Sequence, residues 1–305
     1  MSEKNTEKGV GGRTLLSVVL AAVFIAAAFA IITADSNSSM PTDEKAYIGS
    51  GGEIYYIGTG TGGGAGNDYE DLETLLYAVT LEDGDVIILT SDVSGDSVLV
   101  IGDIGITIYL DEFDLTFALS SGVAIEVQSG GELTINSEGG SLYFSFASGS
   151  GNKGVYANGG TVTVNCDIIA SGAYFYAVST DSTDGGTVTV NGDINATGNS
   201  STTVGVNVFS GGTVTVDGNV FVDGREAYGV STANNNSKAF VTGDVTVIAS
   251  NSHAVGVWAQ SSGNVIEVGG KVTVTNKGTT ASYLAGVYAY NNNTVTIGGC
   301  NFHRT

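Results

Sequence analysis

The phrase Gly-Gly-Thr-Val-Thr-Val occurs three times, at residues 159–164, 185–190 and 211–216, with a step of 26 residues. A fixed period in the twenties is typical of one supersecondary unit stacked many times. Within the phrase, apolar residues alternate with threonine, which is the pattern of a strand with one buried and one solvated face. The chain must therefore fold by repetition of a short β unit.

Six units are visible, the last one cut short. Each begins with Gly-Val-x-Ala or a close variant, and these opening phrases start at residues 154, 177, 205, 229, 256 and 286. Three short strands joined by Gly, Asn, Asp and Ser turns fill one unit. Such strands must pair with their copies in the next unit, which predicts an all-β parallel β-helix with equivalent residues about 4.8 Å apart. An antiparallel sandwich is a weaker alternative, because hairpins do not require a repeated unit.

This register predicts three rows of apolar side chains in the core. The first row is Val162, Val188, Val214, Ala239, Ile266 and Val295; the second is Val164, Val190, Val216, Val241, Val268 and Ile297; the third is Ile168, Ile194, Val220, Val245 and Val272. Small β-branched side chains suit a narrow core, and burying each one contributes roughly 1.5 to 3 kcal/mol.

Residues 1–34 read as an export signal. Basic residues precede the charge-free stretch 14–34, which is long enough to span a bilayer, and acidic residues follow it. The segment is either cleaved as a signal peptide or retained as a signal anchor, and both alternatives stay open. In either case the remainder of the chain is expected outside the cell.

Residues 35–45 are expected to form a linker, and residues 46–305 a single β-helix domain. We expect a cap over 46–84, irregular coils over 85–150, regular repeats over 151–299 and a truncated carboxyl end. Within the cap, 68–79 has leucines on one side and acidic residues on the other, which predicts an amphipathic helix that covers the edge of the first coil. The dinucleotide-like glycines at 58–63 are not favoured as a nucleotide site, because the helix begins several residues too late.

Two passages resemble a known family. Residues 67–79 followed by Gly84–Leu89 look like the capping helix and first strand of pectin-lyase-like right-handed β-helix proteins, and Ile106–Phe117 resembles their early coils. The later repeats are similar to adhesin-like surface proteins of bacteria and archaea. The resemblance covers residues 46–299 and implies a right-handed helix. Glu112-Phe113-Asp114 stands where that family often has Asn-Gly-His, so the match concerns the scaffold and not a catalytic site.

The charge pattern excludes one class of partner. The chain has 31 acidic and ten basic residues and a net charge of -21. Nucleic acid is not an expected partner, because neutralising phosphates requires basic stripes. His253 and His303 have no paired carboxylate in their own units, so we expect no catalytic residues and no cofactor.

One repeat position is acidic and is a candidate calcium site. Asp167, Asp193 and Asp244 occupy it, with Asn219 and Lys271 at the intervening coils. Stacked carboxylates repel each other, and calcium would relieve the repulsion; a solvated turn is the alternative.

The residue after the inward valine of each opening phrase is expected to face solvent. Tyr156, Trp258 and Tyr288 occupy that position, and neighbouring exposed rings suit the apolar face of a sugar. The alternative is that these rings cover the sheet or meet another protomer. Asn37, Asn195, Asn199, Asn235 and Asn292 begin glycosylation sequons and are expected on turns. Cys166 and Cys300 lie too far apart to pair and are expected to be buried.

The sequence therefore predicts a non-catalytic extracellular surface protein, structural or adhesive, whose partners are cell-surface glycans or other surface proteins. The alternative is a polysaccharide lyase or glycoside hydrolase of the pectin-lyase-like class whose site lies in coils beyond the carboxyl end.

Overall fold

The computed structural model describes residues 52–58, 68–181, 185–199, 201–251, 253–278 and 283–304, with side chains described as far as Asn301. The chain divides into Met1–Glu44 and Lys45–Thr305, and all described residues belong to the second part. The predicted signal segment 14–34 and the linker 35–45 lie outside the described residues. None of the helices found in the described ranges is long and apolar enough to cross a membrane.

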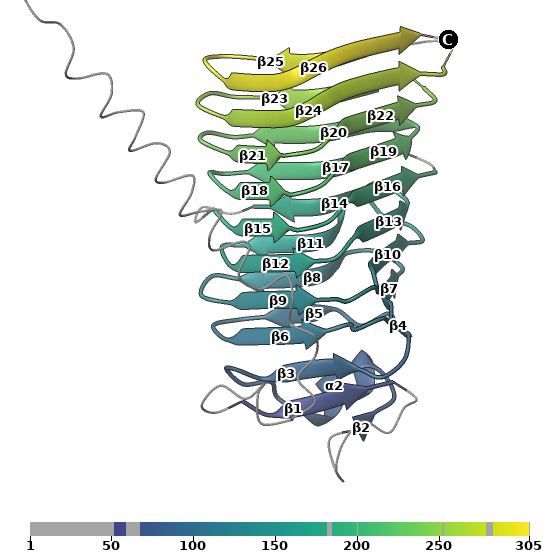
Figure 1. The fold of residues 1–305 in the computed structure, drawn as a ribbon, viewed down its shortest axis with the longest axis vertical. Helices are drawn as coiled ribbons and strands as arrows, with labels where there is room; N and C mark the ends of the chain where they lie inside the picture. Colours follow the sequence, from purple (N-terminus) through teal and green to yellow (C-terminus); the bar gives the residue numbers. More distant parts are fainter. Residues whose placement is uncertain are drawn as a thin grey trace, which may run out of the picture. The chain divides into compact units, whose positions relative to one another are not determined.

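The described residues form a parallel β-solenoid, as the repeat predicted. Each turn contributes one strand to each of three faces, and Figure 1 shows the turns stacked on one another. The strands pair in parallel with their equivalents in the neighbouring turns, for example β12 with β15 and β15 with β18. The backbone hydrogen bonds of the solenoid therefore run along its axis.

The strands are assigned to faces by their pairing. Face 1 contains β1 (Ile54–Ile57), β3 (Val86–Leu89), β6 (Gly105–Tyr109), β9 (Glu132–Asn136), β12 (Thr161–Asn165), β15 (Thr187–Val190), β18 (Thr213–Val216) and β21 (Lys238–Val241). Face 2 contains β4 (Val93–Gly95), β7 (Leu115–Leu119), β10 (Leu142–Phe146), β13 (Ile168–Gly172), β16 (Ile194–Gly198), β19 (Val220–Gly224) and β22 (Val245–Ala249). Face 3 contains β5 (Leu99–Ile101), β8 (Val123–Gln128), β11 (Asn152–Asn158), β14 (Phe175–Thr180), β17 (Thr202–Phe209), β20 (Glu226–Ala233), β23 (His253–Ala259) and β25 (Tyr283–Ala289).

Two long strands connect the first two faces. β24 (Val265–Asn276) and β26 (Thr294–Arg304) pass from face 1 to face 2 without a break, so these faces form one hydrogen-bonded sheet. Face 3 is a separate eight-stranded sheet. A short strand, β2 (Asp68–Tyr69), pairs with β1.

The three predicted core rows are confirmed residue by residue. Val162 pairs with Val188 and Val188 with Val214, and the other two rows keep the same register. Their side chains are buried, except that Val295 and Ile297 on β26 are only partly buried. In the earlier turns larger rings fill the core, as where Phe117 and Phe144 stack at a centroid distance of 5.7 Å. The turns over residues 85–150 thus bury bulkier side chains on the same three faces.

A short helix, α2 (Leu72–Ala78), lies at the β1–β3 end of the stack (Figure 1). The Asp71 side chain caps it by accepting a hydrogen bond from the Thr74 N–H at 2.7 Å. Leu72 and Leu75 are buried in the same cluster as the solenoid core. The helix is shorter than the predicted 68–79 segment, because its first two residues form β2 and Val79 is extended.

The register predicts a matched pair of mutants on β18. Val214 is fully buried, whereas the adjacent Thr215 points outward from face 1. Val214→Asp buries an unpaired carboxylate and should cost several kcal/mol, roughly 4 or more. Thr215→Asp should change stability by about 0.5 kcal/mol. Thermal unfolding measures both, and equal shifts in Tm would contradict the register.

Candidate functional site

The outer surface of face 3 carries two rows of outward-facing side chains. In β11, Lys153 and Tyr156 lie on the same side, with the Lys153 ammonium 3.3 Å from the centroid of the Tyr156 ring, while Val155 points into the core. The inward and outward alternation is therefore interrupted at the opening glycine of the coil. The first row is Lys153, Tyr176, Val204, Tyr228, Val255 and Ala285, and the second is Glu126, Tyr156, Ser179, Asn207, Ser231, Trp258 and Tyr288.

The glycine at this interruption is required by close packing. A Cβ atom on Gly205 would lie 2.6 Å from the Val220 side chain of face 2, and one on Gly229 would lie 2.5 Å from the carbonyl oxygen of Gly256. At these two coils a residue without a side chain is needed, whereas alanine occupies the equivalent position in β8 and β14, as Ala124 and Ala177. The small residue that begins the opening phrase thus allows face 3 to pack against face 2. It also marks the position where the alternation changes, and so determines which residues face outward.

Five rings form a continuous aromatic cluster at the β20–β25 end of this surface. The aromatic cluster consists of Tyr228, Trp258, Tyr283, Tyr288 and Tyr290. Tyr228 and Trp258 stack with their centroids 5.0 Å apart and their planes at 20°. Tyr288 meets Trp258 edge-on at 6.4 Å and contacts Tyr283 at 5.1 Å and Tyr290 at 4.8 Å. Such edge-to-face and stacked pairs are the favoured aromatic geometries.

The predicted exposure of the second row is wrong for most of its members. Ser179 is 0% exposed, Asn207 2% and Ser231 6%. These side chains are small, and Asn207 lies between Ser179 and Ser231 in the row. Trp258 and Tyr288 are half-buried and Tyr290 is half-exposed, so the cluster still presents ring surface to solvent.

Tyr156 does not belong to the cluster. It is four turns away from Trp258 along the second row, roughly 19 Å at the spacing of parallel strands. It is only 9% exposed, and the Lys153 ammonium covers one face of its ring. Burial, followed by the charges of Asp181 and Glu126, raises the pKa of the Tyr156 phenol to about 12. The predicted exposure of Tyr156 is therefore wrong, and its ring is not a neighbour of Trp258 and Tyr288.

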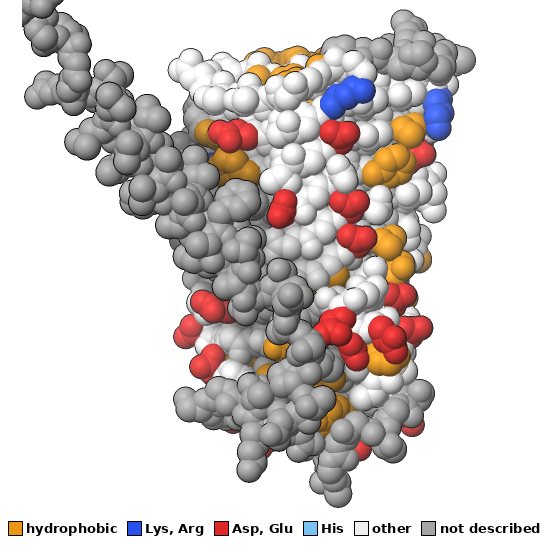
Figure 2. Space-filling model, viewed as in Figure 1, with side chains coloured by type: hydrophobic (Ala, Val, Ile, Leu, Met, Phe, Trp, Pro, Cys, Tyr) orange, Lys and Arg blue, Asp and Glu red, His pale blue; other side chains and the backbone are white. Residues whose placement is uncertain are grey.

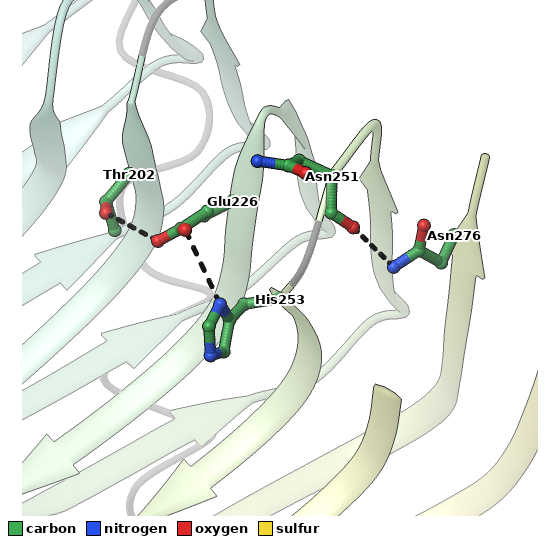
Figure 3. A network of polar contacts seen from close by, with 5 residues as sticks. All are labelled: Thr202, Glu226, Asn251, His253 and Asn276. Carbon is green, nitrogen blue, oxygen red and sulfur yellow. Dashed lines mark hydrogen bonds and ion pairs between the residues drawn. The ribbon is translucent and has the colours of Figure 1, made fainter. Parts of the chain in front are cut away.

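A polar corner borders the cluster. Figure 3 shows Glu226 between Thr202 and His253, each from a different turn. The His253 Nδ1 lies 3.5 Å from a Glu226 carboxylate oxygen, and the Thr202 hydroxyl donates a hydrogen bond to the other oxygen at 3.4 Å. The His253 ring also stacks on Tyr283 of the aromatic cluster at 6.1 Å. His253 thus has a carboxylate neighbour, which comes from the preceding turn and not from its own unit.

A second pair at this corner joins the next two turns. The Asn276 side chain donates a hydrogen bond to the backbone carbonyl of Asn251 at 2.8 Å, as Figure 3 also shows. The turns that lead into face 3 are therefore held to each other by side chains as well as by strand pairing.

The acidic repeat position forms a ladder of side-chain to backbone hydrogen bonds. The Asp167 carboxylate accepts from the Asp193 N–H at 2.8 Å, and Asp193 accepts from the Asn219 N–H at 2.7 Å. Asn219 and Asp244 continue the ladder as acceptors for the Asp244 and Lys271 N–H groups. Across the described residues no group of three or more His, Cys, Asp or Glu side chains could hold a metal ion. The ladder explains why both Asp and Asn occur at this position, because each supplies one acceptor oxygen.

This ladder predicts different outcomes for two substitutions of Asp193. Asp193→Asn keeps an acceptor oxygen and should leave Tm nearly unchanged, whereas Asp193→Ala leaves the Asn219 N–H without its partner and should cost about 1 kcal/mol. Calcium titration of both variants is the control. A calcium-dependent rise in Tm that is lost in Asp193→Asn would contradict the ladder and favour the metal site predicted from sequence.

The remaining sequence candidates have separate places. Cys166 is buried, and burial raises the pKa of its thiol to about 12, which suits a packing residue. Cys300 is exposed on β26, contrary to prediction, because β26 is the last strand described on its faces. Asn199, Asn235 and Asn292 are exposed, but Asn195 lies within β16 and not in a turn. Asn37, the side chain of His303 and most of the 58–63 glycines lie outside the described residues.

The comparisons with other proteins give no relative. The sequence matches no protein-family model, no curated protein and no solved structure.

Three members of the aromatic cluster are not predicted from the sequence. Tyr228 lies just before its opening glycine, where strict alternation does not predict an outward side chain on the same surface as Trp258. Tyr283 and Tyr290 lie at the two ends of the β25 segment, outside the repeated phrase. The available signal was the recurrence of tyrosine directly before the opening phrase, at Tyr176 and Tyr228.

Proposed function

We propose that this chain is a non-catalytic, exported cell-surface protein whose aromatic cluster on face 3 binds glycans. The observation that carries the proposal is the contact network of five rings on an outward sheet surface. Tyr228 is only 9% exposed and packs with the buried Val204 and Val255. The ring surface open to a ligand is therefore that of the partly exposed Trp258 and Tyr288 and the exposed Tyr290. Exposed apolar surface of this kind favours a binding role.

The chemistry of the cluster supports a sugar ligand. Partly exposed rings such as Trp258 and Tyr288 offer apolar faces to the C–H groups of a pyranose ring. The indole N–H of Trp258 and the amide nitrogen of Asn207 have no hydrogen-bond partner. Both are donors, so hydroxyl oxygens of a glycan are suitable acceptors if the rings shift to admit it.

The polar corner supports binding over catalysis. Glycosidases need two carboxyl groups on either side of the scissile bond, whereas at this corner Glu226 faces a histidine and a threonine hydroxyl. The geometry therefore gives no specific reason to prefer a lyase or hydrolase, which remains the alternative prediction from sequence.

The proposal includes the location and the scaffold. The charge-free segment 14–34 would direct export and either anchor the chain or be removed. We also propose that the solenoid is right-handed, because crossovers between parallel strands are almost always right-handed. Finally, the burial of Leu72 and Leu75 supports α2 as a cap over the first turn.

Glycan binding is tested with the double mutant Trp258→Ala/Tyr288→Ala. We expect the intact protein to bind members of a glycan array, and we expect the double mutant to lose about tenfold or more in affinity, because the stacking surface is removed. The matched control is Phe221→Ala, which removes an outward ring from face 2. Binding that is unchanged in the double mutant, with both variants folded, would exclude the cluster as the site.

Location is tested by labelling intact cells that express the full chain. Lys238 is exposed on face 1, so a membrane-impermeant amine reagent should label it from outside. Mass spectrometry of the peptide that contains Lys238 measures the labelling, and a cytosolic protein should stay unlabelled in the same cells. Labelling of Lys238 only after lysis would contradict export.

A further inference from the structure

An acidic side chain lies beside the aromatic cluster at the start of β20. Glu226 begins β20, two residues before Tyr228, and it pairs across turns with Thr202 and His253. His253 in turn pairs with Tyr283 of the next turn. Figure 3 shows the carboxylate directed toward His253. A carboxylate thus lies in the same corner as two rings of the cluster.

The charge of Glu226 acts on the cluster itself. Burial first, and then the negative charge of Glu226, raises the pKa of the Tyr228 phenol to about 12. A phenolate at Tyr228 is therefore opposed by Glu226, and a negatively charged ligand group at the same place would be opposed for the same reason.

We propose that Glu226 is a specificity determinant, and that the cluster accepts uncharged glycans and rejects those that carry carboxylate or sulfate groups. The inference rests on the proposed glycan binding, and it names the ligand class of that same site. The unpartnered donors on Trp258 and Asn207 are buried, and a ligand that displaces the rings above them would offer them either a hydroxyl or a carboxylate oxygen. The Glu226 carboxylate repels a carboxylate oxygen and does not repel a hydroxyl, so it favours the uncharged acceptor.

Lys153, the basic residue of the two outward rows, is too far away to reverse this preference; the basic residue nearest to Glu226 in the chain is Arg225, which directly precedes it and is exposed. Lys153 lies four turns from the level of Trp258, roughly 19 Å, which is beyond the screening length of about 8 Å at physiological salt. Its ammonium already rests on the Tyr156 ring. Burial lowers its pKa, with Asp181 and Glu126 opposing that shift. Figure 2 shows the molecule from the side of faces 1 and 2, where red acidic side chains outnumber blue basic ones; face 3 is not in this view.

The test uses pairs of glycans that differ only in charge. The probes are neutral hexose oligosaccharides and the same oligosaccharides with the C6 hydroxyl oxidised to a carboxylate. At low salt we expect the neutral member of a pair to bind the intact protein about tenfold or more tightly than the oxidised member. This ratio of affinities should decrease at high salt, because screening weakens the repulsion. Glu226→Gln should also decrease the ratio of affinities, by raising the affinity for the oxidised member.

The matched control is Glu267→Gln, which removes an exposed carboxylate from face 1 and should leave the preference unchanged. Equal binding of both members by the intact protein, or an equal effect of the two Glu→Gln variants, would overturn the role of Glu226 while leaving the proposed function in place. If neither member of any pair binds, the proposed function fails and this inference fails with it.

Discussion

The structure depends on the in-register stacking of parallel strands from one turn to the next. Each side chain in this arrangement meets its own equivalent about 4.8 Å away, so a residue type is selected by whether it tolerates a copy of itself as a neighbour. Valine and isoleucine satisfy this condition in the core, where Val162, Val188 and Val214 form one row. The same condition operates at the corners and on the outer surface, with different chemistry.

At the corners, the stacking condition turns acidic residues into structural acceptors. Two stacked carboxylates repel, but Asp167 and Asp193 are each used to accept a backbone N–H of the following turn. Alternation with Asn219 and Lys271 dilutes the charge along the ladder. An acidic column in a solenoid therefore has a sufficient explanation without a metal ion.

On the outer surface of face 3, stacking brings together residues that are far apart in the chain. Tyr228 and Trp258 are 30 residues apart and lie in contact, and Glu226 meets His253 across 27 residues. Any binding surface on this scaffold must be assembled from several turns. Its length along the axis is set by the number of turns that carry suitable side chains, and here the rings are concentrated between β20 and β25.

The sequence by itself determined the solenoid, its three strands per turn and the register of its core. The physical reason is that the repeat encodes periodicity directly: an apolar side chain at every second position of Thr161–Val164 and its copies has a single consistent burial pattern. The sequence also indicated Trp258 and Tyr288 as neighbours, because both occupy one repeat position. It could not give the exposure of Ser179 or Asn207, because an outward position in the alternation does not determine how closely the neighbouring turns pack around a small side chain.

Only the tertiary structure decided which residues share the outer surface of face 3. The interruption at the opening glycine places Tyr228 beside Trp258, and no alternating pattern predicts it, because the interruption arises from close contact between face 3 and Val220 or Val245 of face 2. The contact between His253 and Glu226 could not be predicted for a related reason. Pairing across turns joins residues that belong to different units, and a search within one unit does not find them. The alternation of apolar and polar residues is local and can be read from the sequence. Contacts between turns and between faces join residues that are distant in the sequence, and they form only when the solenoid folds.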